Sequence, residues 1–282
     1  MNFKKVGVLG AGIMGQGIAQ VVAEAGIPVV LVDIDQAIVD KGQKGIISNW
    51  DKAEQKGKKS AEDVAKYKGL LTSDVKTSAM ADCDLVIEAI VEKIAIKQSV
   101  FKELDGICGP NTILASNTSA LSITEIASVT KRTSKVVGVH FFNPVPAMKL
   151  VEIIPGSDTA SDIKDQLIEF CKFIGKEPIP VKESPGFIVN RLLIPYINEA
   201  AIIYGEGVAS AEEIDTAMKL GANMPIGPLA LADLIGIDVC LMIMEYFWNE
   251  TGDSKYRPAL AMKQQVRANA LGRKSGKGFF SY

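Results

Sequence analysis

Histidine is nearly absent from this chain: His140 is the only one among 282 residues. Cysteine is also scarce, and Cys83, Cys108, Cys171 and Cys240 are widely separated and form no Cys-x-x-Cys pair. A structural zinc site needs several nitrogen and sulfur ligands held close together, so the sequence argues against a metal site. We therefore expect no metal, and free thiols in a reducing compartment such as the cytoplasm.

No charge of one sign dominates the composition. The 31 Lys and Arg residues nearly balance the 33 Asp and Glu residues, which leaves a formal net charge of −2. The chain has no overall field that would attract nucleic acid or a membrane surface, so any anion must be held locally. No apolar run approaches the roughly 18 residues that span a bilayer, and the first residues, MNFKKVGVLGAG, lack the apolar core of a signal peptide. These absences favour a cytoplasmic protein.

Hydrophobic residues make up 48% of the chain, which with a mean hydropathy of +0.18 is typical of a packed globular protein. In the first half, short β-branched segments alternate with longer amphipathic ones, which is the pattern of βαβ units. We predict strands at residues 6–9, 29–32, 85–87, 113–115 and 136–139, and helices at 13–25 and 94–108. These elements predict an α/β fold with a Rossmann-type, doubly wound, mostly parallel sheet.

The pattern changes after Pro185 and Gly186, where apolar residues recur at helical spacing. We predict helices at 188–206, 211–220, 229–249 and 259–268, the first of them kinked at Pro195. The sequence therefore predicts two domains, residues 1–184 and an all-α C-terminal domain of residues 185–282.

A glycine-rich fingerprint follows the first predicted strand and opens the first predicted helix. Its glycines are Gly10, Gly12 and Gly15, with Ile13 and Met14 between the last two. Gly10 permits a tight turn, Gly12 lets the backbone approach a pyrophosphate, and Gly15 lets the helix pack closely on its strand. The N–H groups of the first helical turn then bind the anion. The alternative, a glycine-rich turn without a ligand, does not account for the strand and helix that flank the motif.

An acid follows the fingerprint at the distance expected for a ribose ligand. Asp33 ends the second strand 33 − 15 = 18 residues after the third glycine, where its carboxylate would accept hydrogen bonds from the adenosine ribose. It would also repel a 2′-phosphate, Asp35 adds a second negative charge, and no arginine follows. The sequence therefore favours NAD over NADP.

His140 stands at the carboxyl end of the last predicted parallel strand, where ligands of open α/β sheets collect. A lone histidine is more often a core residue, but Glu152 favours a catalytic one. If the segment NPVPAM turns the chain back, residues 136–140 and 150–154 lie side by side, with His140 and Glu152 symmetric about Pro146. A carboxylate there would fix the imidazole tautomer and stabilise an imidazolium.

Seven segments across the whole chain resemble the short, monofunctional 3-hydroxyacyl-CoA dehydrogenases, most closely the bacterial 3-hydroxybutyryl-CoA branch. They are VLGAGIMGQGIAQ, DLVIEAIVEKIAIKQSVF, ILASNTSALSITEIA, VVGVHFFNPVPAMKLVEII, ESPGFIVNRLLIPYINEA, LGANMPIGPLALADLIGID and LGRKSGKGFF. The resemblance implies NAD-dependent interconversion of (S)-3-hydroxybutyryl-CoA and acetoacetyl-CoA, in fatty acid or butanoate metabolism. It also implies a homodimer formed through the helical domain, with the substrate in the cleft between domains. One departure, Ala120 where another serine is common, is expected to be harmless.

The resemblance assigns catalysis to His140 and Glu152 and adds Ser119 and Asn190. A serine hydroxyl and an asparagine amide would donate to the C3 oxygen or thioester carbonyl of the substrate, where charge develops. From the residues alone, an ordinary structural role is an equally good interpretation, with Ser119 a loop serine and Asn190 an asparagine inside a helix. The resemblance further implies polar contacts with the nicotinamide half of the cofactor by Glu92, Lys97, Asn117, Ser119 and Asn143.

Lys52 and Lys56 form an i,i+4 pair on one predicted helix face, suited to the phosphates of coenzyme A. A solvated lysine face is an equally good interpretation. Two rival functions therefore remain: a dehydrogenase of the same fold that acts on a hydroxy acid without coenzyme A, and a non-catalytic NADH-binding protein. The second gives no reason for Ser119, His140, Glu152 and Asn190 to occur together.

Overall fold

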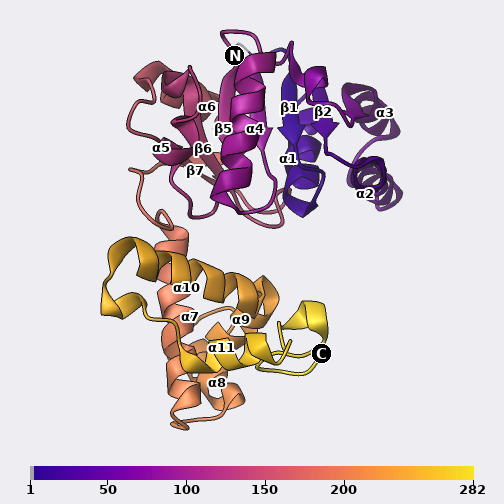
Figure 1. Ribbon diagram of the computed structural model, residues 1–282. Helices are drawn as coiled ribbons and strands as arrows, with labels where there is room; N and C mark the ends of the chain where they lie inside the picture. Colours follow the sequence, from indigo (N-terminus) through magenta and orange to yellow (C-terminus); the bar gives the residue numbers. More distant parts are fainter. Residues whose placement is uncertain (1–2) are drawn as a thin grey trace. The chain divides into compact units, whose positions relative to one another are not determined.

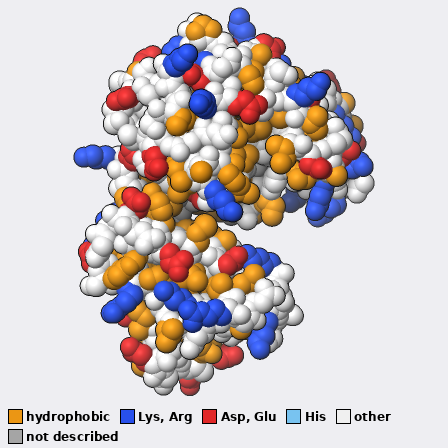
Figure 2. All heavy atoms as spheres, in the orientation of Figure 1, with side chains coloured by type: hydrophobic (Ala, Val, Ile, Leu, Met, Phe, Trp, Pro, Cys, Tyr) orange, Lys and Arg blue, Asp and Glu red, His pale blue; other side chains and the backbone are white. Residues whose placement is uncertain are grey.

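The computed structural model describes residues 3–282 and divides the chain into two compact units (Figure 1). The first unit ends at Glu183, and the second is Ser184–Tyr282. Within residues 3–282, no helix is both long enough and apolar enough to cross a membrane. Figure 2 shows acidic and basic side chains interspersed over the face it presents, in keeping with the nearly balanced charge.

The first unit is built around an eight-stranded sheet of order β3-β2-β1-β4-β5-β6-β7-β8. Strands β1 to β6 are parallel; β7 is antiparallel to β6, and β8 is parallel to β7. The strands are β1 Val6–Leu9, β2 Val29–Val32, β3 Leu71–Asp74, β4 Leu85–Glu88, β5 Ile113–Ser116, β6 Val136–Phe141, β7 Leu150–Pro155 and β8 Glu177–Pro180. The predicted Rossmann-type, mostly parallel sheet is confirmed.

Helices cover both faces of this sheet. They are α1 Ile13–Glu24, α2 Gln36–Gln55, α3 Ala61–Leu70, α4 Ile94–Ile107, α5 Ile123–Ala127 and α6 Ser161–Phe173. Alternate strand residues such as Val8 and Ile87 pack with Ile18 of α1 and Leu167 of α6 in one continuous core. Figure 1 shows α4 crossing the sheet at β5, and α2 and α3 together at one end of the unit.

The two edge strands were missed by the sequence analysis for a physical reason. β3 (LTSD) is only partly buried, and β8 (EPIP) contains two prolines. Proline cannot donate to a ladder, so a strand with this composition is tolerated only at an edge, where the apolar signal is also weakest.

The second unit consists of helices around its own core. They are α7 Val189–Gly205, α8 Ala211–Gly221, α9 Pro228–Ile235, α10 Ile237–Thr251 and α11 Leu260–Arg267. The single helix predicted at 229–249 is wrong, because Gly236 has a φ of +107°, which a right-handed helix cannot contain. α7 continues across Pro195.

Candidate active site

Predicted site residues from several strands of the first unit collect at one edge of the sheet. Strands β1, β2, β4, β5 and β6 are parallel, so all of them end at this carboxyl edge. β1 lies between β2 and β4, where the strand order reverses, and ligands of open α/β sheets bind outside such a point. The site residues that end or follow these strands are Gly10, Asp33, Glu92, Asn117, Ser119 and His140.

The three fingerprint glycines have different surroundings. Gly10 has a φ of +106°, and a Cβ there would lie 2.5 Å from the Ala89 carbonyl oxygen. A Cβ on Gly15 would lie 1.7 Å from the Gly10 carbonyl oxygen, so these two positions require glycine. A Cβ on Gly12 would meet no protein atom within 4 Å. Gly12 therefore borders the open space that a pyrophosphate would fill.

The first turn of α1 fits an anionic ligand. No side chain of the described residues caps this helix at Gly12, so its first N–H groups remain available. Ile13 is 73% exposed, whereas Met14 packs against the core of the unit. The residues of this turn thus fit the pyrophosphate of a dinucleotide cofactor.

Asp33 directly follows β2 and is held against the glycine-rich loop. One carboxylate oxygen accepts from the Ala11 N–H at 2.7 Å, and the other accepts from the Ile34 N–H at 2.8 Å. Each oxygen retains a lone pair that can accept from a ribose hydroxyl. Asp35 has a structural task that the sequence analysis missed, because its side chain caps α2 by accepting from the Ala37 and Ile38 N–H groups.

His140 and Glu152 face each other across the only antiparallel pair of strands in the described sheet. They are register partners on β6 and β7, and His140 Nδ1 lies 2.7 Å from Glu152 Oε2. The predicted pairing of these strands around Pro146 is confirmed. His140 is 4% exposed and Glu152 1%, so the contact is shielded from water. In a neutral imidazole whose proton lies on Nδ1, the acceptor lone pair is on Nε2. The Phe142 and His140 ring centroids lie 4.4 Å apart.

A carboxylate holds Ser119 in place. Glu92 Oε1 accepts from the Ser119 N–H at 2.7 Å and from the Thr118 hydroxyl at 2.6 Å. The second Glu92 oxygen lies 3.3 Å from Lys97 Nζ. Glu92 follows β4, and its side chain therefore anchors the segment that follows β5.

Lys97 is almost entirely buried and pairs with acids. Its ammonium donates to Glu88 Oε1 at 2.6 Å, and Lys97 and Glu88 are 1% and 0% exposed. Glu88 also accepts from the Ser116 hydroxyl at 2.7 Å. Lys97 therefore acts on the site through Glu88 and Glu92, and its direct contact with a cofactor stays a prediction. Glu88 was not predicted from the sequence as the buried partner of Lys97, because its only signal was an acid at the end of an apolar strand.

The two asparagines differ in their setting. Asn117 is 8% exposed, and its side-chain oxygen accepts from the Phe141 N–H at 2.8 Å, which ties the end of β5 to the end of β6. Asn143 is exposed and precedes Pro144 through a cis peptide bond in the turn after β6. Asn143 is thus the more exposed of the two, and the contact of each residue with the nicotinamide stays a prediction.

The remaining predicted residues lie elsewhere. Asn190 belongs to the first turn of α7 in the second unit and is partly buried. Lys52 lies in the last turn of α2, and Lys56 follows that helix, with its N–H bonded to the Lys52 carbonyl at 3.2 Å. Both lysines are exposed, and neither forms a salt bridge with any residue from 3 to 282.

The cysteines offer no reactive thiol. All four are free and buried, and burial raises the pKa of Cys83, Cys171 and Cys240 to about 12. A thiol with so high a pKa is neutral and a poor nucleophile. Among the residues that the structure describes, no group of three or more His, Cys, Asp or Glu side chains is placed to hold a metal ion.

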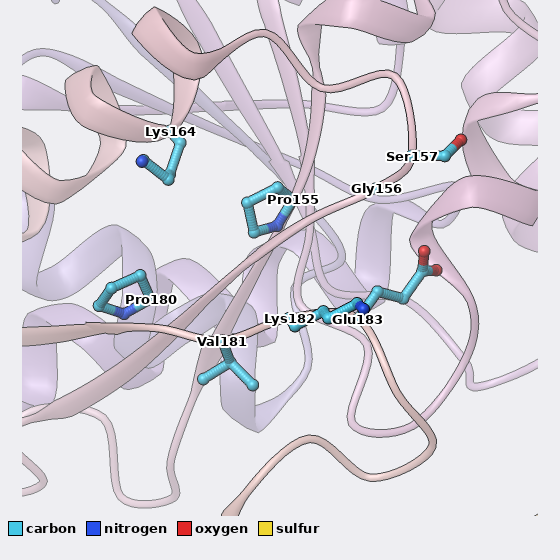
Figure 3. A pocket seen from close by; sticks show the side chains of 8 residues that line it. All are labelled: Pro155, Gly156, Ser157, Lys164, Pro180, Val181, Lys182 and Glu183. Atoms are coloured by element: carbon cyan, nitrogen blue, oxygen red, sulfur yellow. The ribbon is translucent and has the colours of Figure 1, made fainter.

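One hollow of the first unit lies away from these residues. It is lined by Pro155, Gly156, Ser157, Lys164, Pro180, Val181, Lys182 and Glu183 (Figure 3). Pro155 pairs with Val137 near the start of β6, whereas His140 lies near its end. The hollow is therefore at the opposite edge of the sheet.

A shielded imidazole and carboxylate beside a dinucleotide cradle form the arrangement of a nicotinamide-dependent dehydrogenase, and the chain is of that class. The comparisons define the class further: residues 5–184 match the 3-hydroxyacyl-CoA dehydrogenase NAD binding domain, and residues 186–282 match the 3-hydroxyacyl-CoA dehydrogenase C-terminal domain. The chain belongs to the 3-hydroxyacyl-CoA dehydrogenase family, and its cofactor is NAD.

Two curated proteins and one solved structure agree with this assignment over nine tenths or more of their length. The chain is 52% identical to the 3-hydroxybutyryl-CoA dehydrogenase of Clostridioides difficile, covering 99% of each chain. It is 45% identical to the mitochondrial hydroxyacyl-coenzyme A dehydrogenase of Homo sapiens, over 99% of this chain and 91% of the human one. The crystal structure of (S)-3-hydroxybutyryl-CoA dehydrogenase from Ralstonia eutropha matches with a TM-score of 0.96 at 48% identity, covering 100% of this chain and 99% of that one.

Proposed function

We propose that this enzyme interconverts (S)-3-hydroxybutyryl-CoA and acetoacetyl-CoA with NAD as the hydride carrier. The observation that carries the proposal is the 2.7 Å contact between His140 Nδ1 and Glu152 Oε2 at the carboxyl edge of the sheet. The names of the bacterial relatives support the substrate, since a CoA thioester with a short 3-hydroxyacyl group is what they are described as oxidising.

The pair can hold and move one proton. The bound nicotinamide supplies or accepts the hydride at C3 of the substrate. His140 Nε2 takes the hydroxyl proton during oxidation and returns it to the C3 oxygen during reduction. Glu152 keeps the proton of the neutral imidazole on Nδ1 and stabilises the imidazolium once Nε2 is protonated. Because both side chains are buried, this charge stabilisation is stronger than it would be in water.

Ser119 and Asn190 orient the substrate in this proposal. Ser119 is supported by its backbone bond to Glu92, which fixes the residue beside the ends of β4 and β5. A serine hydroxyl and an asparagine amide suit the C3 oxygen and the thioester carbonyl, because both donate hydrogen bonds where negative charge develops.

The test is oxidation of NADH by the purified protein with acetoacetyl-CoA, compared with free acetoacetate. We expect turnover with the thioester and little with the free acid. Equal turnover of both would favour the rival dehydrogenase of hydroxy acids. Binding of NADH without turnover of either compound would leave a non-catalytic NADH-binding protein.

Cofactor preference should depend on Asp33. We expect Asp33→Arg to weaken the use of NADH and improve the use of NADPH, because it removes a ribose acceptor and adds a partner for the 2′-phosphate. The measurement is kcat/KM with each cofactor. A companion variant, Asp35→Asn, keeps a capping side chain on α2 and removes only the second negative charge, so it should shift the preference much less than Asp33→Arg. An unchanged preference in Asp33→Arg would exclude Asp33 as the ribose ligand.

The lysine pair is proposed to bind the phosphates of coenzyme A. We expect Lys52→Ala with Lys56→Ala to raise KM for acetoacetyl-CoA with little change in kcat, the pattern of lost uniform binding. The effect should shrink at high ionic strength, because the lysines are exposed. An unaltered KM at low salt would identify them as ordinary surface lysines.

We further propose that the enzyme is a homodimer in the cytoplasm. Large apolar side chains of the second unit are exposed, with Leu192 71%, Leu220 81% and Leu260 63% accessible, and Figure 2 shows hydrophobic side chains gathered on this unit. The four free thiols favour a reducing compartment. Sedimentation as a single 30.2 kDa species at micromolar concentration would exclude the dimer.

A further inference from the structure

One carboxylate outside the proposed catalytic set gathers three hydrogen-bond donors. Glu183 Oε1 accepts from the Ser122 hydroxyl at 2.7 Å and from the Thr124 N–H at 2.9 Å, and Oε2 accepts from the Thr124 hydroxyl. In Figure 3 the Glu183 side chain extends toward the segment of Ser157 and not toward Lys164. Bonds to an ionised acceptor are the strong ones, so this contact fixes the start of α5 firmly.

The donors of Glu183 end the loop that carries Ser119. We name residues 117–122, between β5 and α5, the Ser119 loop. Glu92 holds the first part of this loop through the Ser119 N–H, as described above, and Glu183 holds its last residue, Ser122. The Ser119 loop is therefore fixed by one carboxylate at each end.

The same contact reaches the strand of Glu152. The Thr124 hydroxyl, which donates to Glu183, accepts from the Ser157 N–H at 2.9 Å, and Ser157 follows the end of β7. Glu183 thus locks the end of the Ser119 loop against the strand that carries the partner of His140.

Glu183 is also the last residue of the first unit. Ser184 begins the second unit, and Asn190 follows 190 − 183 = 7 residues later. One side chain therefore fixes the end of the Ser119 loop at the boundary of the first unit. Capping of α5 does not depend on Glu183, because Ser122 already caps this helix by accepting from the Glu125 N–H at 3.0 Å.

We propose that Glu183 is a positioning residue for catalysis, which sets the Ser119 loop in the geometry needed for turnover. The inference rests on the proposed function, because its effect is seen as turnover of a 3-ketoacyl thioester. Glu183 does not touch the substrate or the proton in this account; it acts through Ser122 and Thr124.

The test compares Glu183→Ala and Glu183→Gln with Lys182→Gln, a neighbouring exposed residue, as the matched control. We expect Glu183→Ala to lower kcat/KM for acetoacetyl-CoA by about tenfold or more, because small displacements of orienting groups are costly. Glu183→Gln should lose less, since both hydroxyls can rotate to meet an amide. The Kd for NADH should change far less than kcat/KM, because the glycine-rich loop and Asp33 lie outside the Ser119 loop. Lys182→Gln should match the unmodified protein.

A double-mutant cycle with Thr124→Val makes the test independent of folding. Because Glu183 also accepts from the Ser122 hydroxyl, Glu183→Gln should still lower kcat/KM in the Thr124→Val background, but by a smaller factor than in the unmodified protein. A melting temperature that falls in Glu183→Ala while kcat/KM of the folded protein stays unchanged would overturn the inference, as would an equal loss of NADH binding. Absence of turnover by the unmodified protein would reject the proposed function as well, so the two failures are distinguishable.

Discussion

Replacing His140 by glutamine is expected to lower kcat for the reduction of acetoacetyl-CoA by roughly 10²–10⁴-fold, the usual contribution of a general acid or base. Glutamine has a similar reach and can still bond Glu152, but it cannot take up and release a proton near neutral pH. The Kd for NADH should be unchanged, because the glycine-rich loop and Asp33 do not contact His140. Steady-state kinetics and NADH fluorescence titration measure the two quantities.

The competing interpretation is that His140 is only a core residue. It is 4% exposed and bonded to a buried carboxylate, so its loss would then cost about 1–3 kcal/mol of stability, the penalty for an unsatisfied buried group. Under that interpretation the melting temperature of His140→Gln falls while kcat per folded molecule stays near that of the unmodified enzyme. This order of damage would remove His140 from the mechanism.

Replacing Glu152 by glutamine is expected to reduce kcat by about 10–100-fold, because a hydrogen bond to a charged group contributes about 1.5–3 kcal/mol. The amide oxygen can still accept from Nδ1–H and hold the ring, but it carries no charge to stabilise the imidazolium. The NADH affinity should persist, since Glu152 lies on β7, away from the dinucleotide cradle.

A matched control for Glu152→Gln is Glu177→Gln, an exposed acid at the start of the neighbouring strand β8. It should leave kcat unchanged. If Glu152→Gln also leaves kcat unchanged, the carboxylate only packs against His140. If the double variant His140→Gln, Glu152→Gln is no slower than His140→Gln alone, the two residues act as one unit.

The sequence predicted the parts of the fold whose signal is local. Adjacent residues predicted the strand before Gly10 and the helix after it. The spacing about Pro146 predicted which residues of β6 and β7 pair. The sequence did not predict that the helix is interrupted at Gly236. The apolar spacing continues on both sides, and only the backbone conformation of Gly236 separates α9 from α10. The edge strands β3 and β8 are partly exposed, so they lack the apolar pattern by which central strands are predicted.

The long-range polar contacts of the site could not be predicted from the sequence. Glu92 meets the backbone N–H of Ser119, 27 residues away, and Glu183 meets Thr124, 59 residues away. Neither contact leaves a spacing signal, because the partners are brought together by the order of strands in the sheet. Lys97 carried a misleading signal: a lysine near the start of an amphipathic helix is expected to be solvated, yet it is buried against Glu88 and Glu92.

The most direct test of the central claim, that His140 with Glu152 moves the proton that accompanies hydride transfer, is a single-turnover experiment. Enzyme saturated with NADH is mixed rapidly with excess acetoacetyl-CoA, and the loss of NADH absorbance is followed for the unmodified enzyme and for His140→Gln. We predict that both proteins bind NADH equally and that His140→Gln oxidises it slower by roughly 10²–10⁴-fold. Oxidation of the bound NADH by His140→Gln at the rate of the unmodified enzyme would contradict the account.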